Sequence, residues 1–264
     1  DQKQQFENKF IAWAKGKPEY ENVMADYEKN YAAWSPYSKM RQYLNEGILG
    51  SPLAGNASRL ISLETVLLKS SSSAADLKKA VDAATAARAA FKESEDLPSD
   101  EKILASTAMM FYNDVDKNQH PIGFYEGIKN AYGSLNDEAT FKAWAKDVFA
   151  KTMMLDDAKW KAFSDAPTAA ALQEDPAFAY AAAFTKNYTS KYVSLRTDFM
   201  NKNDELGRAY LKGIMEMNPA AVNKMYPDAN FSMRVSYGNV KSYNPRDAVH
   251  YDYVCTGKGI LEKY

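Results

Sequence analysis

Residues 20–34 read YENVMADYEKNYAAW, and their large apolar and aromatic side chains recur every three or four positions. This spacing gathers on one helix face the side chains of Tyr20, Val23, Tyr27, Tyr31 and Trp34. Proline lacks a backbone N–H, so Pro36 predicts that this helix ends or kinks two residues later. The stretch predicts an amphipathic helix, and the same pattern fills most of the chain.

Helical spacing continues to about residue 225. We expect further helices near residues 1–14, 37–49, 60–67, 74–93, 98–111, 121–132, 136–148, 156–163, 176–199 and 204–217. Asn136 and Asp156 are predicted N-caps, and the helix after Pro176 is expected to bury Phe184, Tyr188, Tyr192, Leu195 and Phe199. Glycine is scarce, with 12 among 264 residues, which favours helices over a turn-rich β-fold. The prediction is a mainly α domain over residues 1–225.

The pattern changes in residues 226–264. Residues 231–237 read FSMRVSY and alternate apolar with polar side chains, and residues 248–254 (AVHYDYV) are again typical of a strand. Turn residues lie between them, at 238–239 and 244–247. We expect two or three strands, with Phe231, Met233, Val235 and Tyr237 on one apolar face. A lone hairpin is marginally stable in water, so we expect these strands to belong to a larger sheet and the chain to be a piece of a longer protein.

Composition excludes several classes of protein. Lys and Arg number 33 and Asp and Glu 34, which gives a formal charge of -1 and no basic footprint for nucleic acid or a membrane surface. No apolar run reaches the roughly 18 residues needed to span a bilayer. The single cysteine, Cys255, excludes an internal disulfide and a thiolate-rich metal site. We expect no metal and no other cofactor.

Few residues here have a pattern typical of catalysis. The two histidines, His120 and His250, are too far apart in the sequence to form a local zinc motif. A dyad of His250 with Cys255 is disfavoured because residues five apart on a strand point to opposite faces. His250 and Asp252 would share a face, and we interpret them as a surface pair. We therefore assign no catalytic residue in this chain.

Two other sets of residues were weighed as site candidates. Ser99 and Lys102 fit a Ser-x-x-Lys pattern, but Ser99 follows Pro98 and is interpreted as a helix cap. Tyrosine is abundant, with 18 residues. We expect Tyr27, Tyr31, Tyr188 and Tyr192 in the core, whereas a groove for an extended peptide is an alternative role for Tyr37, Tyr43, Tyr125 and Tyr132. Substrate-binding residues remain unassigned.

Residues 226–264 carry a family resemblance. They read YPDANFSMRVSYGNVKSYNPRDAVHYDYVCTGKGILEKY, with Pro227 to Phe231, Pro245-Arg246-Asp247 and Gly259 to Lys263 as the strongest elements. Weaker similarity lies upstream, at Phe10 to Trp13 and at Asp96 to Lys102. The order of these elements resembles the bacterial dipeptidyl-peptidase 7 and dipeptidyl-peptidase 11 family.

The resemblance implies a fold and an activity. Members are serine exopeptidases that release dipeptides from the free amino terminus of peptides, and a helical domain is inserted into their chymotrypsin-like double β-barrel. The chain would then comprise that helical domain (1–225), which caps the substrate cleft, and strands returning to the barrel (226–264). The resemblance also implies a periplasmic or secreted location, peptide substrates and, for the intact enzyme, a homodimer. The family's catalytic His, Asp and Ser have no counterpart in this chain, so the chain alone is expected to be inactive.

Two other functions were weighed. A free-standing helical module that binds a peptide or protein is the main alternative, and it would be indicated by an internal repeat of about 34 residues. We find no such repeat in the sequence. A self-contained enzyme is disfavoured because no set of catalytic residue types converges.

Overall fold

The computed structural model describes residues 2–94, 96–223, 225, 233 and 235–263. It divides into two compact units, residues 1–217 and residues 218–264. The sequence set this boundary near residue 225, whereas the structural division follows the end of a long helix at Met217. The described residues of the first unit form helices and no strand, which confirms the mainly α prediction.

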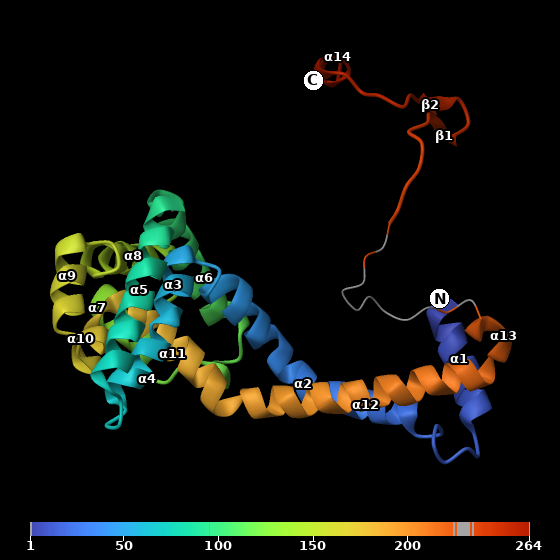
Figure 1. The fold of residues 1–264 in the computed structure, drawn as a ribbon, viewed down its shortest axis with the longest axis horizontal. Helices are drawn as coiled ribbons and strands as arrows, with labels where there is room; N and C mark the ends of the chain where they lie inside the picture. Colours follow the sequence, from blue (N-terminus) through green and yellow to red (C-terminus); the bar gives the residue numbers. More distant parts are fainter. Residues whose placement is uncertain (1, 95, 224, 226–232, 234, 264) are drawn as a thin grey trace. The chain divides into compact units, whose positions relative to one another are not determined.

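The first unit runs through a series of helices of very different length (Figure 1). Their order is α1 (Gln2–Ala14), α2 (Val23–Gln42), the π-helix η1 (Tyr43–Ile48), α3 (Pro52–Arg59), α4 (Ile61–Leu68), α5 (Ala74–Ser94), α6 (Leu97–Asp114), the 3₁₀ turn η2 (Lys117–Gln119), α7 (Phe124–Tyr132), α8 (Glu138–Lys151), α9 (Asp157–Asp165), α10 (Ala169–Glu174), α11 (Pro176–Lys191) and α12 (Val193–Met217).

The larger hydrophobic core lies among η1 and helices α3 to α11. Helix α6 packs against α8 and η1, and α11 packs against α3. The centre is aromatic, and its fully buried rings include Phe111, Phe141, Phe178, Tyr180 and Phe184. Burying a side chain of this size stabilises the fold by about 1.5–3 kcal/mol. Because η1 is part of this core, the core holds it in place.

A smaller core joins the two ends of the first unit. Helix α2 runs beside the long helix α12, and α1 packs against α12 (Figure 1). Phe10 of α1 is fully buried and would lie 2.7 Å from a Cβ atom at Gly213 of α12. Tyr20 Oη donates a hydrogen bond to Glu216 Oε1 at 2.7 Å. The first and last helices of the unit are therefore in contact.

The second unit contains α13 (Pro219–Val222), β1 (Tyr243–Arg246), β2 (Val249–Tyr251) and α14 (Gly257–Leu261). The two strands pair antiparallel, with Tyr243 opposite Tyr251. The strand predicted over 248–254 is confirmed at residues 249–251. Its partner β1, however, includes residues 244–246, which were predicted as a turn. The turn itself lies at residues 247–248.

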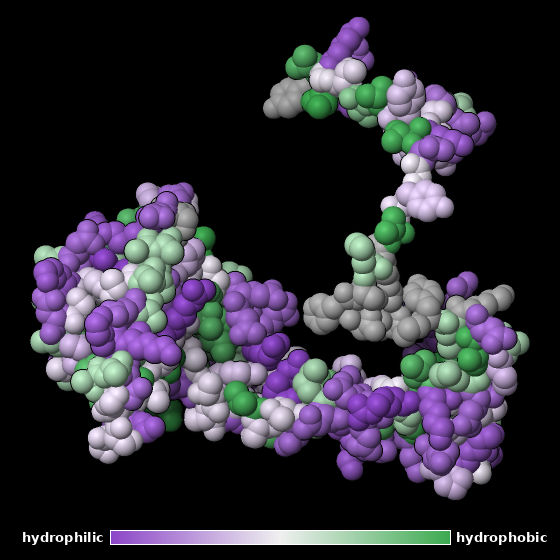
Figure 2. Space-filling view, in the orientation of Figure 1, coloured by the Kyte–Doolittle hydropathy of each residue, from purple (hydrophilic) through white to green (hydrophobic). Residues whose placement is uncertain are grey.

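The strand predicted over 231–237 is not observed in the residues described there. Residues 231, 232 and 234 lie outside the described part of the chain, and Met233 and residues 235–242 have no regular secondary structure. Met233, Val235, Tyr237 and Val240 are 77–98% exposed. Figure 2 shows apolar side chains on the surface of this unit. Three of the four residues of the expected apolar face, Met233, Val235 and Tyr237, are therefore exposed, and Phe231 lies outside the described residues.

Several predicted helix boundaries were wrong. Helix α2 continues through Pro36 to Gln42, so no separate helix covers residues 37–49. The break predicted near residue 200 lies at Tyr192 instead, and Leu195 and Tyr31 are exposed rather than buried. Asp137, not Asn136, caps α8, because its carboxylate accepts the N–H of Ala139 at 2.9 Å. The Asp156 cap of α9 is confirmed.

Candidate functional site

The π-helix η1 is an unusual feature of this fold. The backbone N–H of Leu49 donates to the carbonyl of Leu44 at 2.8 Å, which is the five-residue spacing of a π-helix. Gly50 follows the segment at a position where no side chain fits, since a Cβ atom there would stand 2.1 Å from the carbonyl oxygen of Glu46. Short π-helical segments occur frequently at functional sites. The junction of α2 and η1 is therefore a candidate position for a site.

A hollow of about 600 Å³ lies where α2 joins η1 and faces α12. Helix α2 and η1 present to it, at helical spacing, the side chains of Tyr31, Trp34, Ser35, Ser38, Arg41, Gln42, Asn45 and Glu46. Helix α12 contributes from its first half Arg196, Phe199, Met200 and Asn203. Asn30 Nδ2 donates to the carbonyl of Phe199 at 3.1 Å and so links the two helices beside the hollow. The hollow is a cationic and aromatic concavity of a size that holds small ligands.

A second, smaller pocket of about 280 Å³ shares Gln42 and Glu46 with this hollow. Its other walls are Tyr43, Gly47, Thr107 and Met110, and they are mostly apolar. Tyr43 Oη donates to Asp114 Oδ2 at 2.6 Å, and this bond raises the pKa of the tyrosine. The α2–η1 junction thus has a polar hollow on one side and an apolar pocket on the other.

His120 lies in a different concavity, of about 600 Å³, with Lys117, Glu126, Lys129 and Lys191 among its lining residues. Its Nε2 atom is 3.0 Å from the carbonyl oxygen of Val115. Burial is the main cause that lowers the pKa of His120. The ring packs against Phe111 and Tyr125, with ring centroids 5.5 and 4.9 Å apart. We interpret His120 as a core histidine, since its hydrogen bond is to the backbone and no nucleophile is paired with it among the described residues.

The other sequence candidates are not brought together. His250 Nδ1 lies 2.8 Å from Asn244 Oδ1 across the hairpin. Strand β2 ends at Tyr251, so Asp252 and Cys255 follow the strand and the alternating-face argument does not reach them. Cys255 is exposed. Nothing in the described geometry assigns a reaction to this group.

Ser99 is not the predicted cap. Helix α6 begins at Leu97 with Asp96 in the N-cap position, and Ser99 Oγ donates to Asp96 Oδ2 at 2.6 Å in the first turn. Ser99 is exposed. Among the contacts described, the Ser99 hydroxyl bonds the Asp96 carboxylate and does not bond Lys102.

The four tyrosines proposed for a groove have different surroundings. Tyr125 is buried and donates to the carbonyl of Ala108 at 2.9 Å, so it belongs to the core. Tyr37 packs on Tyr192, and Tyr132 bonds Asp147 at 3.0 Å. Only Tyr43 lines a pocket beside η1. The hollow itself uses Tyr31, which the sequence pattern placed in the core.

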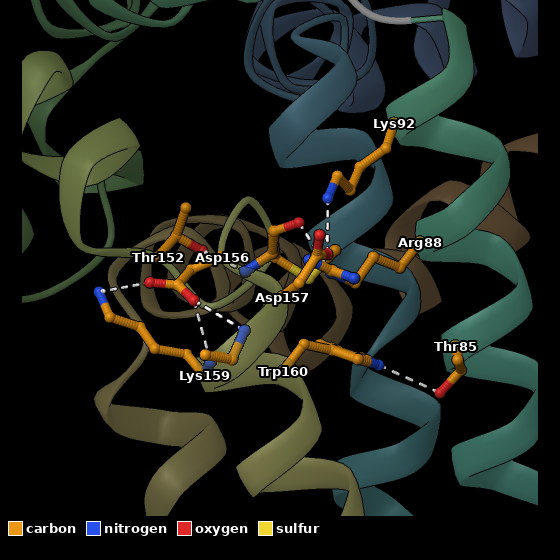
Figure 3. A network of polar contacts seen from close by, with 10 residues as sticks. Thr85, Arg88, Lys92, Thr152, Asp156, Asp157, Lys159 and Trp160 are labelled. Atoms are coloured by element: carbon orange, nitrogen blue, oxygen red, sulfur yellow. Dashed lines mark hydrogen bonds and ion pairs between the residues drawn. The ribbon is translucent and has the colours of Figure 1, made fainter.

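Arg88 and Asp157 form the centre of a polar network between α5 and α9 (Figure 3). Arg88 Nη2 and Lys92 Nζ lie 2.7 and 2.6 Å from Asp157 Oδ1, and Arg88 Nε donates to the carbonyl of Met154 at 2.9 Å. Hydrogen bonds from Lys92 and then Arg88 lower the pKa of Asp157. Both cations have Asp157 as their partner and Arg88 also bonds a backbone carbonyl, so we interpret the network as a structural link.

Within the described ranges, no group of three or more His, Cys, Asp or Glu side chains is placed to hold a metal ion. Likewise, none of the helices in the described part of the chain is long and apolar enough to cross a bilayer.

The chain matches a family model for peptidase S46 over residues 1–264. An Asp/Glu-specific dipeptidyl-peptidase of Flavobacterium psychrophilum is 30% identical over 264 residues, covering 98% of this chain and 34% of that protein. A dipeptidyl-peptidase 7 of Phocaeicola vulgatus is 34% identical over 143 residues, covering 53% of this chain and 18% of that protein. The chain spans about a third of the length of the first of these relatives.

The fold is also similar to a solved structure. The crystal structure of Porphyromonas endodontalis DPP11 in complex with the dipeptide Arg-Glu superposes with a TM-score of 0.69 and 22% identity, covering 97% of this chain and 35% of that one. At this identity the likeness concerns the fold. It extends over both units of the chain.

Proposed function

Since the chain belongs to the peptidase S46 family, we propose that it is the helical part of a serine dipeptidyl-peptidase, with the segment that leads back to the catalytic barrel. The parent enzyme releases dipeptides from the free amino terminus of peptides. The support is the family match over residues 1–264 and two groups of relatives, both named as dipeptidyl-peptidases.

The contact between α1 and α12 is the observation that best supports an inserted domain. A domain inserted into another must leave and re-enter its host at neighbouring points, and domain ends are often close together. Phe10 packs against Gly213, and Tyr20 bonds Glu216, so residues near the two ends of the first unit meet. An independent core holds this junction, with Phe10, Ala14, Tyr20 and Val23 at its centre.

The role that we propose for the helical part is to cap the substrate cleft. A cap excludes water from the reacting bond and admits only a free peptide end. The nucleophile, its base and the oxyanion hole would be supplied by the barrel, because acyl transfer needs all three in one place. In the same proposal the intact enzyme is a periplasmic or secreted homodimer that acts on peptides and needs no metal or other cofactor.

The test is an assay of the complete reading frame that contains residues 1–264. We expect it to release dipeptides from chromogenic dipeptidyl substrates. The panel should contain acidic and hydrophobic penultimate residues, because some relatives are named Asp/Glu-specific whereas the name of others states no specificity. Replacing the catalytic serine that the family resemblance implies for the complete protein by alanine should abolish turnover. Purified residues 1–264 should show none. Turnover by residues 1–264 alone would contradict the proposal that the barrel supplies the catalytic groups. An inactive complete protein would contradict the proposed dipeptidyl-peptidase activity.

A further inference from the structure

Arg196 rests on an aromatic platform inside the hollow between α2 and α12. Its guanidinium carbon lies 5.4 Å from the ring centroid of Trp34 and 5.4 Å from that of Phe199. The two rings are stacked, with centroids 5.9 Å apart and an interplanar angle of 24°. Tyr31 meets Phe199 edge-on at 5.1 Å and extends the platform. The rings orient the guanidinium and stabilise its charge without using its N–H donors.

Arg41 lines the same hollow from the last turn of α2. Throughout residues 2–94, 96–223 and 235–263, neither arginine has a carboxylate oxygen within 4.0 Å of its guanidinium. The one acid in the lining, Glu46, accepts a hydrogen bond from Gln42 at 3.2 Å. The lining therefore has two cations and one anion. It lacks the partner that a guanidinium fork ordinarily binds.

The remaining polar walls are uncharged donors and acceptors. Ser35, Ser38, Asn45 and Asn203 carry hydroxyl or amide groups of the kind that bind a peptide backbone. The volume, about 600 Å³, is within the range of small-ligand sites and suits a few peptide residues. A polyanion such as nucleic acid is disfavoured because the chain as a whole carries a charge of -1.

We propose that this hollow binds a carboxylate of a peptide, with Arg196 as the principal ligand and Arg41 as the second. The choice of a peptide rests on the proposed function. The carboxylate comes either from the carboxyl terminus or from an acidic side chain, since both offer the planar pair of oxygens that guanidinium binds. Such a site would hold a part of the substrate that carries a carboxylate.

Binding can be measured by titration calorimetry on purified residues 1–264 with three tetrapeptides. One is tetra-alanine with a free carboxyl terminus, one is its amide, and one is the amide with a single glutamate. We expect the plain amide to bind at least tenfold more weakly than one of the other two, and the peptide that binds identifies the source of the carboxylate. Equal binding of all three, or no binding, would overturn the proposal.

Variants then locate the site. Arg196→Gln and Arg41→Gln should each weaken binding of the carboxylate peptide, Arg196→Gln by about tenfold or more, in line with a charge-assisted hydrogen bond. Arg196→Lys keeps the charge but loses the planar fork and should bind with intermediate affinity. Arg208→Gln removes an exposed arginine from the same helix, outside the hollow, and should bind like the parent chain.

The outcomes separate the two proposals. If both glutamine variants bind like the Arg208 control while circular dichroism shows them folded, the hollow is not the site. Inorganic phosphate competing as well as the peptide would reduce the hollow to a general anion site and also contradict the proposal. Dipeptide release by the complete protein from short neutral substrates tests the proposed function separately. That assay can fail while carboxylate binding to residues 1–264 persists.

Discussion

The carboxylate of Asp100 accepts a hydrogen bond from the backbone N–H of Leu53 at 2.8 Å, and so joins the first turn of α6 to the first turn of α3. The side chain is buried, and its other oxygen has no hydrogen-bond partner among the described residues. An acid at a helix start also interacts favourably with the helix dipole. Asp100 thereby fixes α3 directly after the π-helix, next to the candidate site.

Replacing Asp100 by alanine should strongly destabilise the first unit. It leaves the Leu53 N–H buried without an acceptor, which costs about 1–3 kcal/mol. Asp100→Asn keeps an acceptor oxygen and should lose less. Urea denaturation would measure both variants against Asp165→Ala, which removes an exposed acid and should change the free energy of unfolding by less than about 0.5 kcal/mol. A loss no larger than that of the control would contradict the role given to this carboxylate.

Asp100 should also give stability a pH dependence of unusual sign. Burial raises its pKa above the ordinary value of 3.8, and the interactions with the Ser51 side chain and the Leu53 N–H only partly oppose this. The folded state then binds a proton more tightly than the unfolded state, so stability falls as pH rises from about 4 through the raised pKa. The difference in unfolding free energy between the parent chain and Asp100→Asn, measured across this range, isolates the contribution. A difference that grows in favour of the parent chain with rising pH would contradict the sign.

Helix α12 contains two glycines that should respond oppositely to alanine. A Cβ atom at Gly213 would stand 2.7 Å from Phe10 Cε2 and 3.2 Å from Tyr20 Cδ1, whereas at Gly207 the nearest atom is Tyr27 Oη at 3.4 Å. Both changes gain about 1 kcal/mol of helix propensity. Gly207→Ala should therefore raise the melting temperature. Gly213→Ala should lower it, because overpacking costs about 1–3 kcal/mol. Equal shifts would mean that Phe10 can move aside, which would weaken the case for a fixed junction between α1 and α12.

A buried carboxylate on α4 provides a test of charge pairing. The Glu64 side chain is 3% exposed and bonds Gln173 Nε2 and Lys186 Nζ, each at 2.7 Å. Lys186→Met leaves that charge without its cation. Because the lysine is 47% exposed, solvent screening reduces the expected loss to about 1–2 kcal/mol. Adding Glu64→Gln should recover much of it.

Chemical denaturation of the two single variants and the double variant measures this coupling. Lys78→Met breaks a fully surface pair with Asp82 and should cost less than about 0.5 kcal/mol. If the double variant is no more stable than Lys186→Met, the carboxylate does not need its cation.

Periodicity predicted the helical class, most helix positions and the strand around His250, because apolar spacing reports directly on burial. It failed where packing between distant residues determines where a helix ends. Pro36 sits inside α2, where its carbonyl accepts Gln119 Nε2 at 3.0 Å. Tyr192 separates α11 from α12 although neither a proline nor a glycine is present there, and it is buried against Tyr37. Contacts between residues so distant in the sequence leave no local pattern.

The candidate site was accessible to sequence reasoning only in part. Trp34, Ser38, Arg41 and Asn45 continue the helical spacing of the first stripe, and the change from aromatic to polar residues was a signal of a solvated groove. The pairing of that face with Arg196 could not be inferred, because α2 and α12 come from opposite ends of the first unit. The π-helix could not be inferred either, since the close approach of Gly50 to the backbone of Glu46 leaves no pattern in the spacing of apolar residues.

Gly50 offers the sharpest test of whether the π-helix shapes the site. In Gly50→Ala the new Cβ would meet the Glu46 carbonyl oxygen at 2.1 Å, a backbone contact that no side-chain rotation relieves. The end of η1 must shift, and Asn45 and Glu46, which line the hollow, must move with it. We expect a loss of at least about 1–3 kcal/mol in unfolding free energy and weaker binding of the carboxylate peptide. Gly47→Ala is the matched control, because its Cβ would lie 3.7 Å from Thr107 in ordinary contact. It should retain both stability and peptide affinity, and a Gly50→Ala variant that also retained both would show that the hollow does not depend on the π-helix.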